Sequence, residues 1–163
     1  MKKLTWVILL LVAGTAAFAK QHKHKGNKAP ANNIVSVSLR HTACYGRCPV
    51  YTIEVNKDGI ATYTATLFNQ DTGVFIKNLG IKKVMEIINR FNIYRIDTCK
   101  DKYESRHTDL PGTILAIKYH DSTKTIMDAN AGPPILAELR TMMDGLITKK
   151  LDNTWQKVPE TQK

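Results

Sequence analysis

The chain has 163 residues, a formal net charge of +10 and 43% hydrophobic residues, a size that suits one domain with a single core. Six of its 24 Lys and Arg residues precede Ile34, which leaves 18 basic against 14 acidic residues in the rest of the chain. These opposite charges alternate without aromatic residues gathered between them, which argues against nucleic acid as a partner. The sequence also lacks a Walker loop, a dinucleotide fingerprint and internal repeats.

Residues 1–19 have the pattern of a secretory signal peptide. Two lysines precede an apolar run over residues 4–12, and an A-x-A cleavage signature ends at Ala19. The alternative is an uncleaved anchor, but the run is shorter than the roughly 20 residues that cross a bilayer. We therefore expect cleavage near Ala19 and a periplasmic or secreted protein with no transmembrane anchor after cleavage.

Residues 20–33 are polar and basic, and we expect a disordered tether. Cleavage after Ala19 would place an amine, two backbone amides and the imidazole of His22 in one local set. Four such nitrogens can form the square plane that Cu(II) prefers, and His24 adds a neighbouring imidazole. The sequence thus predicts a copper site at His22 and His24, with a solvated spacer as the alternative.

Alternating apolar and polar residues predict four strands in the next part of the chain, within residues 34–39, 51–55, 60–67 and 74–78. Asp58-Gly59 is a turn signal between the second and third strands, and it predicts a hairpin. Apolar residues then recur at helical spacing from Ile81 to Phe91, and Asn92 is a plausible stop. Residues 93–111 are predicted to form a long ordered connection.

Two further strands, within residues 113–119 and 123–128, predict a second hairpin. Pro133-Pro134 then opens a helix that Gly145 can end, with an apolar face of Ile135, Leu139, Met142 and Leu146. We expect one α+β domain over residues 34–148, an antiparallel sheet with two helices packed on one face in the order ββββαββα. Residues 149–163 form a tail that Trp155 docks on the domain.

The segment around Cys44 and Cys48 is the candidate site. Cys44 and Cys48 are the candidates for a disulfide with each other. The alternatives are a bridge from either of them to Cys99, or thiols kept for metal binding or redox chemistry. In a bridged loop, Gly46 would supply the unusual backbone angles that a small ring demands. His41, Cys44 and Cys48 have a conceivable zinc spacing, but no second pair of close ligands follows.

A second group of polar residues lies in the long connection: Tyr103, Glu104, His107 and Asp109. These side chains can line a polar pocket. The alternative is structural, with Asp109 capping a turn before Leu110-Pro111 and Tyr103 acting as a buried anchor whose hydroxyl is bonded.

Two motifs resemble those of an uncharacterised family of exported bacterial domains, described only as a domain of unknown function. The first is C-[YF]-G-x-C-P-x-Y, matched by residues 44–51. The second is a tyrosine before T-D-x-P, matched by Tyr103, Asp109 and Pro111. The resemblance covers residues 34–144 and implies no activity or cofactor. Cys99 and the histidines of the tether lie outside its pattern.

The sequence favours a non-catalytic module that binds an unknown protein or small ligand in the cell envelope. Its candidate binding residues are Tyr45, Arg47, Tyr103 and Asp109, and we assign no catalytic residue and no cofactor. The alternative is a thiol- or metal-dependent enzyme that uses Cys44 and Cys48.

Overall fold

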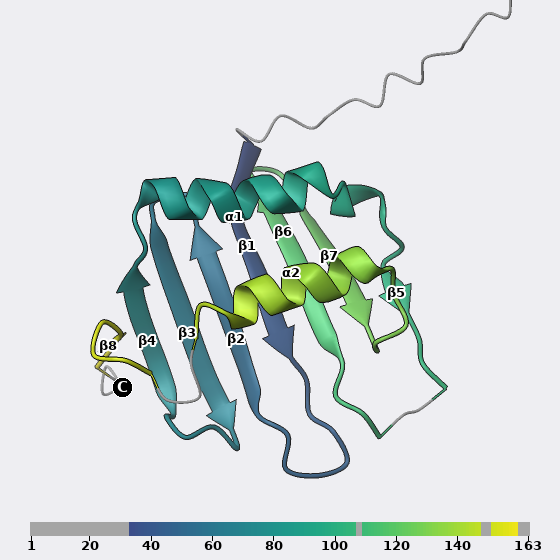
Figure 1. The fold of residues 1–163 in the computed structure, drawn as a ribbon, viewed down its shortest axis with the longest axis horizontal. Coiled ribbons are helices and arrows are strands. Elements are labelled where there is room, and N and C mark those ends of the chain that lie inside the picture. Colours follow the sequence, from purple (N-terminus) through teal and green to yellow (C-terminus); the bar gives the residue numbers. More distant parts are fainter. Residues whose placement is uncertain (1–32, 107–108, 148–150, 160–163) are drawn as a thin grey trace, which may run out of the picture.

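The computed structural model of the chain describes residues 33–106, 109–147 and 151–159. These residues form one eight-stranded sheet with two helices on one of its faces (Figure 1). The strand order across the sheet is β5-β7-β6-β1-β2-β3-β4-β8. All neighbours are antiparallel except β5, which pairs parallel with β7. The predicted α+β class is therefore confirmed.

Six strands lie where the alternation of apolar residues predicts them: β1 (Ile34–His41), β2 (Val50–Asn56), β3 (Ile60–Leu67), β4 (Gly73–Asn78), β6 (Thr113–Tyr119) and β7 (Thr123–Asp128). Two more strands, β5 (Lys102–Tyr103) and β8 (Gln156–Lys157), pair with the outer strands of the sheet. Each has only two residues, too few for a period, so the predicted order ββββαββα lacks them. The helices are α1 (Ile81–Ile93) and α2 (Pro134–Asp144), and a 3-10 turn covers Ile96–Thr98.

The core lies between the sheet and the helices. Residues on the covered face, such as Leu39, Ile53 and Leu115, are buried, whereas the opposite face carries polar side chains such as Thr62 and Thr64. This arrangement explains the period of two along the strands. Helix α1 contributes four buried residues to the core: Val84, Ile87, Ile88 and Phe91.

The predicted apolar face of α2 is partly wrong. Leu139 is buried as expected, but the other fully covered residues of the helix are Leu136 and Met143. Ile135 and Met142 are only partly buried, because the helix is turned so that Met142 borders the space beside α1. The predicted end is correct, since α2 ends at Asp144 and Gly145 is its C-cap.

The Asp58-Gly59 hairpin is confirmed. Gly59 has a φ of 93°, a left-handed conformation that residues other than glycine rarely adopt. The Asn56 side chain accepts hydrogen bonds from the backbone amides of Asp58 and Ile60, each at 3.1 Å. This turn fixes the register of β2 against β3.

The described part of the tail packs against the open edge of β4. The amide of Val158 donates to the carbonyl of Val74 at 2.8 Å, and Trp155 is only 7% exposed. The predicted docking of Trp155 is therefore confirmed. Among the described residues, no helix is long and apolar enough to cross a membrane.

Candidate functional site

The connection between β1 and β2 is a loop closed by a disulfide between Cys44 and Cys48, with a Cα–Cα distance of 5.8 Å. We call residues 44–48 the cysteine loop. Cys99 is a free, half-buried thiol, so the alternative of a bridge to Cys99 is wrong. Gly46 is not among the glycines with positive φ, so the expectation that it supplies unusual backbone angles is also wrong. Neither Cys44 nor Cys48 is therefore a free thiol.

The cysteine loop lies beside the segment around Asp109. The amide of Tyr45 donates to the carbonyl of Asp109 at 3.3 Å, and the amide of Thr42 donates to the carbonyl of Gly112 at 3.0 Å. The Thr42 hydroxyl both donates to the Gly112 carbonyl and accepts from the Gly112 amide, each at 3.0 Å. These bonds join two segments that are about 70 residues apart in sequence at one end of the sheet.

Two predicted binding residues extend from the cysteine loop. The Tyr45 side chain is 95% exposed. The guanidinium of Arg47 lies 5.8 Å from the ring centroid of Phe68, which immediately follows β3. The cysteine loop is thereby in contact with the β3–β4 connection as well as with the segment around Asp109.

Tyr103, a third predicted binding residue, does not lie near the cysteine loop. It lies on β5 at the far edge of the sheet, with β7 and β6 between it and β1. It packs against the core and its hydroxyl accepts a hydrogen bond from the amide of Lys100 at 3.2 Å. Glu104 forms an ion pair with Lys102. His107, His22 and His24 lie outside the described residues, so the predicted copper site does too.

Three residues that the sequence did not bring together form a network behind the loop: His41, Tyr51 and Asp144. His41 ends β1, Tyr51 lies opposite it on β2, and Asp144 is the last residue of α2. Asp144 Oδ1 lies 3.0 Å from His41 Nε2 and accepts a hydrogen bond from the Tyr51 hydroxyl at 2.9 Å. Because a carboxylate only accepts, the imidazole carries a proton on Nε2. The network ties the end of α2 to β1 and β2.

Tyr51 is held in its neutral, donating form. Burial raises the pKa of its hydroxyl well above the ordinary value, and the adjacent Asp144 carboxylate raises it further. The rings of His41 and Tyr51 are stacked at 4.5 Å between centroids. His41, the conceivable zinc ligand, is thus already engaged with Asp144 and Tyr51. In the described part of the chain, no group of three or more His, Cys, Asp or Glu residues is placed to hold a metal.

A row of aromatic rings continues from this network across the sheet. Tyr51 lies 5.5 Å from Tyr63, which in turn lies 6.1 Å from both Phe75 and Trp155, measured between ring centroids. Burial raises the pKa of Tyr63, with Asp71 as a second cause, so this phenol also stays neutral. Its hydroxyl donates to the side chain of Asn69 at 3.2 Å.

A pocket of about 390 Å³ opens over this row, between the end of α2 and the β3–β4 connection. We call it the Phe68 pocket. It is lined by Pro49, Tyr51, Tyr63, Phe68, Asn69, Gln70, Asp71, Asp144, Ile147 and Leu151. Its walls thus combine aromatic rings, amides and two carboxylates. Phe68 lines the pocket, and its ring centroid also lies 5.8 Å from the guanidinium of Arg47 in the cysteine loop.

Phe68 has a strained backbone. Its φ of 56° lies in the left-handed region, which is unusual for a bulky side chain. The next residue holds it there, because the side-chain amide of Asn69 donates to the backbone carbonyls of Val50 and Leu67, each at 2.8 Å. Phe68 is 51% exposed, its ring centroid lies 5.8 Å from the Arg47 guanidinium, and it lines the pocket. Backbone conformations of this kind cluster at binding sites and active sites, which makes Phe68 a candidate binding residue.

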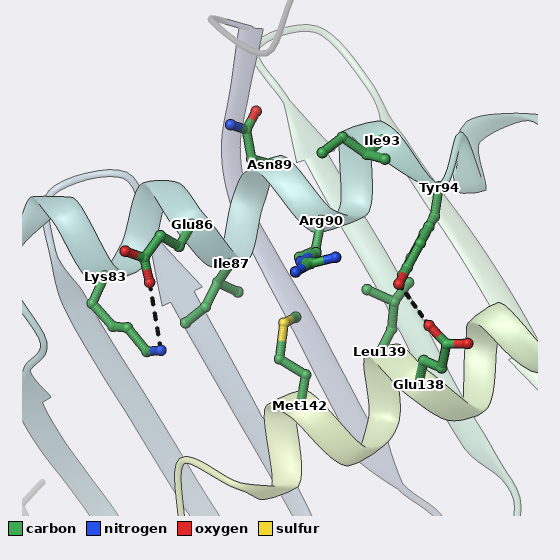
Figure 2. A pocket seen from close by; sticks show the side chains of 10 residues that line it. All are labelled: Lys83, Glu86, Ile87, Asn89, Arg90, Ile93, Tyr94, Glu138, Leu139 and Met142. Carbon is green, nitrogen blue, oxygen red and sulfur yellow. Dashed lines mark hydrogen bonds and ion pairs between the residues drawn. The ribbon is translucent and has the colours of Figure 1, made fainter.

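A larger hollow, of about 760 Å³, lies between α1 and α2 (Figure 2). Its lining includes the buried Ile87 and Leu139, and four of its polar side chains form two pairs with one another. The Tyr94 hydroxyl donates to Glu138 at 2.6 Å, and Lys83 pairs with Glu86 at 3.6 Å. It contains no residue of the two sequence motifs, whereas the Phe68 pocket contains Pro49 and Tyr51 of the first motif. We therefore take the cysteine loop and the Phe68 pocket as the candidate site.

The sequence offered uneven signals for this site. Tyr51 belongs to the motif C-[YF]-G-x-C-P-x-Y, and His41 has a zinc-ligand spacing to Cys44 and Cys48, but no local pattern points to Asp144 or Phe68. Residues 35–147 match the family described as "Domain of unknown function (DUF6438)", which covers more than half of the chain. No curated protein is significantly similar to the chain.

Proposed function

We propose that this chain, which belongs to the family of the domain of unknown function DUF6438, is a non-catalytic binding module of the cell envelope. Its binding surface is the end of the sheet that carries the cysteine loop, the segment around Asp109 and the Phe68 pocket. The observation that carries the proposal is the disulfide-closed loop, which presents a Tyr45 side chain that is 95% exposed.

The exposed residues at this end are of the kinds that dominate binding energy. Tyr45, Arg47 and Phe68 belong to types enriched at interfaces, and Leu110, beside Asp109, is 56% exposed. Apolar side chains gathered at one end of a small domain mark an interaction surface.

The surface is also rigid before it binds. The disulfide, the bond from Tyr45 to Asp109 and the paired bonds between Thr42 and Gly112 fix its backbone. A preorganised surface loses less conformational entropy on association, so more of its contact energy appears as affinity. Disulfides persist in oxidising compartments, which supports the proposal that the chain is exported.

The alternative, a thiol- or metal-dependent enzyme, has less support. A disulfide contains no thiolate, which is the form that attacks substrates or ligates metals. Alkylation followed by intact-mass measurement separates the two functions: the unreduced, unfolded chain should take one label, on Cys99, and the reduced chain three. Labelling of Cys44 and Cys48 without reductant, or stoichiometric zinc by elemental analysis, would contradict the proposed function.

The binding surface is tested by site-specific photo-crosslinking in cells that carry the native chain. A photoreactive phenylalanine analogue replaces Tyr45 in one variant and Asp121 in the control. Asp121 is exposed in the β6–β7 turn, which lies at the opposite end of β1 from the cysteine loop. We expect a discrete adduct from position 45 only. Equal adducts from both positions, or none from position 45, would contradict the proposal.

Phe68→Gly provides a second arm, because glycine adopts the left-handed backbone of position 68 without strain. The variant should therefore keep its fold while losing an exposed ring of the surface. We expect the adduct from position 45 to weaken at unchanged thermal stability. An adduct of undiminished yield would show that Phe68 is not part of the binding surface.

A further inference from the structure

We infer that the Phe68 pocket takes a positively charged organic group, an alkylammonium or a guanidinium, carried by whatever the proposed surface binds. The inference rests on the proposed function and names the chemistry of its ligand. It is carried by the charges and rings that line the pocket.

The charge of the described lining is entirely negative. Asp71 and Asp144 are the only charged residues among the described residues that line the pocket. Arg47 is not one of them, although its guanidinium lies 5.8 Å from the ring centroid of Phe68. Asp144 accepts from Tyr51 and His41, and Asp71 accepts one long bond of 3.3 Å from the amide of Leu151. A carboxylate offers about four lone-pair positions, so both retain acceptor capacity toward the pocket.

The walls favour the same kind of group. Tyr51, Tyr63 and Phe68 present aromatic surface, and a cation near an aromatic face is attracted by its quadrupole. The chain itself uses this interaction around the pocket, since Lys77 lies 5.7 Å from the Trp155 ring and Lys157 lies 5.8 Å from the Phe75 ring. Within the described residues, no lysine or arginine lies in this way over Tyr51 or Tyr63.

The size of the pocket and the charge of its described lining favour a small cationic group over other occupants. A volume of about 390 Å³ is near the lower end of the usual range for small-molecule pockets, which suits a side chain or a small amine. An anion would meet two carboxylates and no described cation in the lining. A positively charged group, by contrast, gains charge-assisted hydrogen bonds to both carboxylates.

The test is an NMR titration of the full mature chain at low salt. The probes are the blocked amino acids N-acetyl-lysine methylamide and N-acetyl-arginine methylamide, with N-acetyl-norleucine methylamide as the uncharged analogue and methyl glucoside as a neutral sugar. The indole N–H of Trp155, whose ring adjoins Tyr63, and the amide of Leu151 report on the pocket. We expect saturable shifts with the two cationic probes, weakened at least threefold by half-molar salt.

Matched variants locate the site. Asp71→Asn keeps an oxygen acceptor for the Leu151 amide and removes one charge, and it should weaken binding at least tenfold. Asp121→Asn makes the same charge change in the β6–β7 turn and should leave affinity within twofold. Putrescine separates the sources of the cation: tighter binding than the lysine probe indicates a free amine, and weaker binding indicates a lysine or arginine on a protein partner.

Equal binding of norleucine or of the sugar, or no saturable shift with any probe, would overturn the inference. So would equal weakening by Asp71→Asn and Asp121→Asn, which would indicate a long-range charge effect. The proposed function would stand in each case if position 45 still gave a discrete adduct. Loss of that adduct with cation binding intact would instead contradict the proposed surface and leave the pocket chemistry in place.

Discussion

Tyr51 shows how burial sets the chemistry of a single residue. It is half-buried against the core and its hydroxyl donates to Asp144, so ionisation would place a second negative charge beside a carboxylate. The pKa of this phenol is therefore raised above its ordinary value of 10.0, whereas the unfolded chain keeps the ordinary value.

The raised pKa predicts a loss of stability in alkali. The folded state holds the proton of Tyr51 more tightly than the unfolded state, so its contribution is complete below pH 10 and falls as the pH rises above it. Tyr51→Phe should cost about 1 kcal/mol at pH 8 through the lost hydrogen bond to Asp144. We expect this deficit to shrink by up to about 1 kcal/mol per pH unit above pH 10.

The measurement is urea unfolding at pH 8, 10 and 10.8, with Cys99→Ser in every variant to prevent thiol exchange with the disulfide. Tyr45→Phe is the control, since Tyr45 is exposed and its replacement should leave the pH dependence unchanged. Parallel curves for the parent and Tyr51→Phe would show that burial of Tyr51 does not couple its proton to folding.

The disulfide gives a second prediction at the residue scale. Closing so small a loop stabilises the folded state by about 2 kcal/mol in the chain-entropy model. The double variant Cys44→Ser/Cys48→Ser should lose this amount and keep its circular dichroism spectrum. Cys99→Ser should lose less than about 1 kcal/mol, because Cys99 is half-buried and unbridged. Equal losses in denaturant melts would indicate that the thiols exchange partners in solution.

At the scale of elements, the local sequence pattern is enough to predict a strand or helix where one face of the element is buried. The period of two identified the six long strands, and Asp58-Gly59 located the turn between β2 and β3. The pattern does not predict which face of α2 is buried. Ile135 and Leu136 are both apolar, and only the packing of the helix decides that Leu136 is the buried one. The pattern also misses β5 and β8, because two-residue strands exist only through their partners.

The β2–β3 turn supports a prediction about glycine. A Cβ at Gly59 would lie 3.2 Å from backbone atoms of Gly80 and Ile81, and the φ of 93° adds strain. Gly59→Ala should therefore cost about 2 kcal/mol in thermal or urea unfolding. A Cβ at Gly46 would meet only the Cys44 sulfur, at 3.7 Å, so Gly46→Ala should cost less than about 0.5 kcal/mol. A similar loss for both would contradict the conformational argument.

At the scale of the whole molecule, the site depends on contacts that no local pattern contains. Asp144 meets His41 and Tyr51 across 103 and 93 residues, and Asp71 meets Leu151 across 80. The sequence could therefore identify the cysteine loop, whose residues are adjacent, but not the pocket behind it. The tail that closes this pocket lies beyond residue 147, where the family match ends.

This tail supports the last prediction, that Trp155 stabilises both the domain and the pocket. Its ring is 7% exposed, lies 6.1 Å from Tyr63 and carries the Lys77 ammonium 5.7 Å above it. Trp155→Ala should cost about 3 kcal/mol, because it removes a large buried ring and leaves a cavity beside Tyr63. Asn153→Ala, at an exposed position of the same segment, should cost less than about 0.5 kcal/mol.

Circular dichroism during urea unfolding measures both losses, and the cationic probes measure the effect on the pocket. We expect Trp155→Ala to weaken binding of the lysine probe as well, since a tail released at Trp155 also withdraws Leu151 from the pocket wall. Asn153→Ala should leave binding unchanged. If Trp155→Ala unfolds at the parent's urea concentration, the prediction that Trp155 stabilises the domain is wrong, and the remaining contacts of the tail, such as the packing of Leu151 against the core and its bond to Asp71, are enough to hold it.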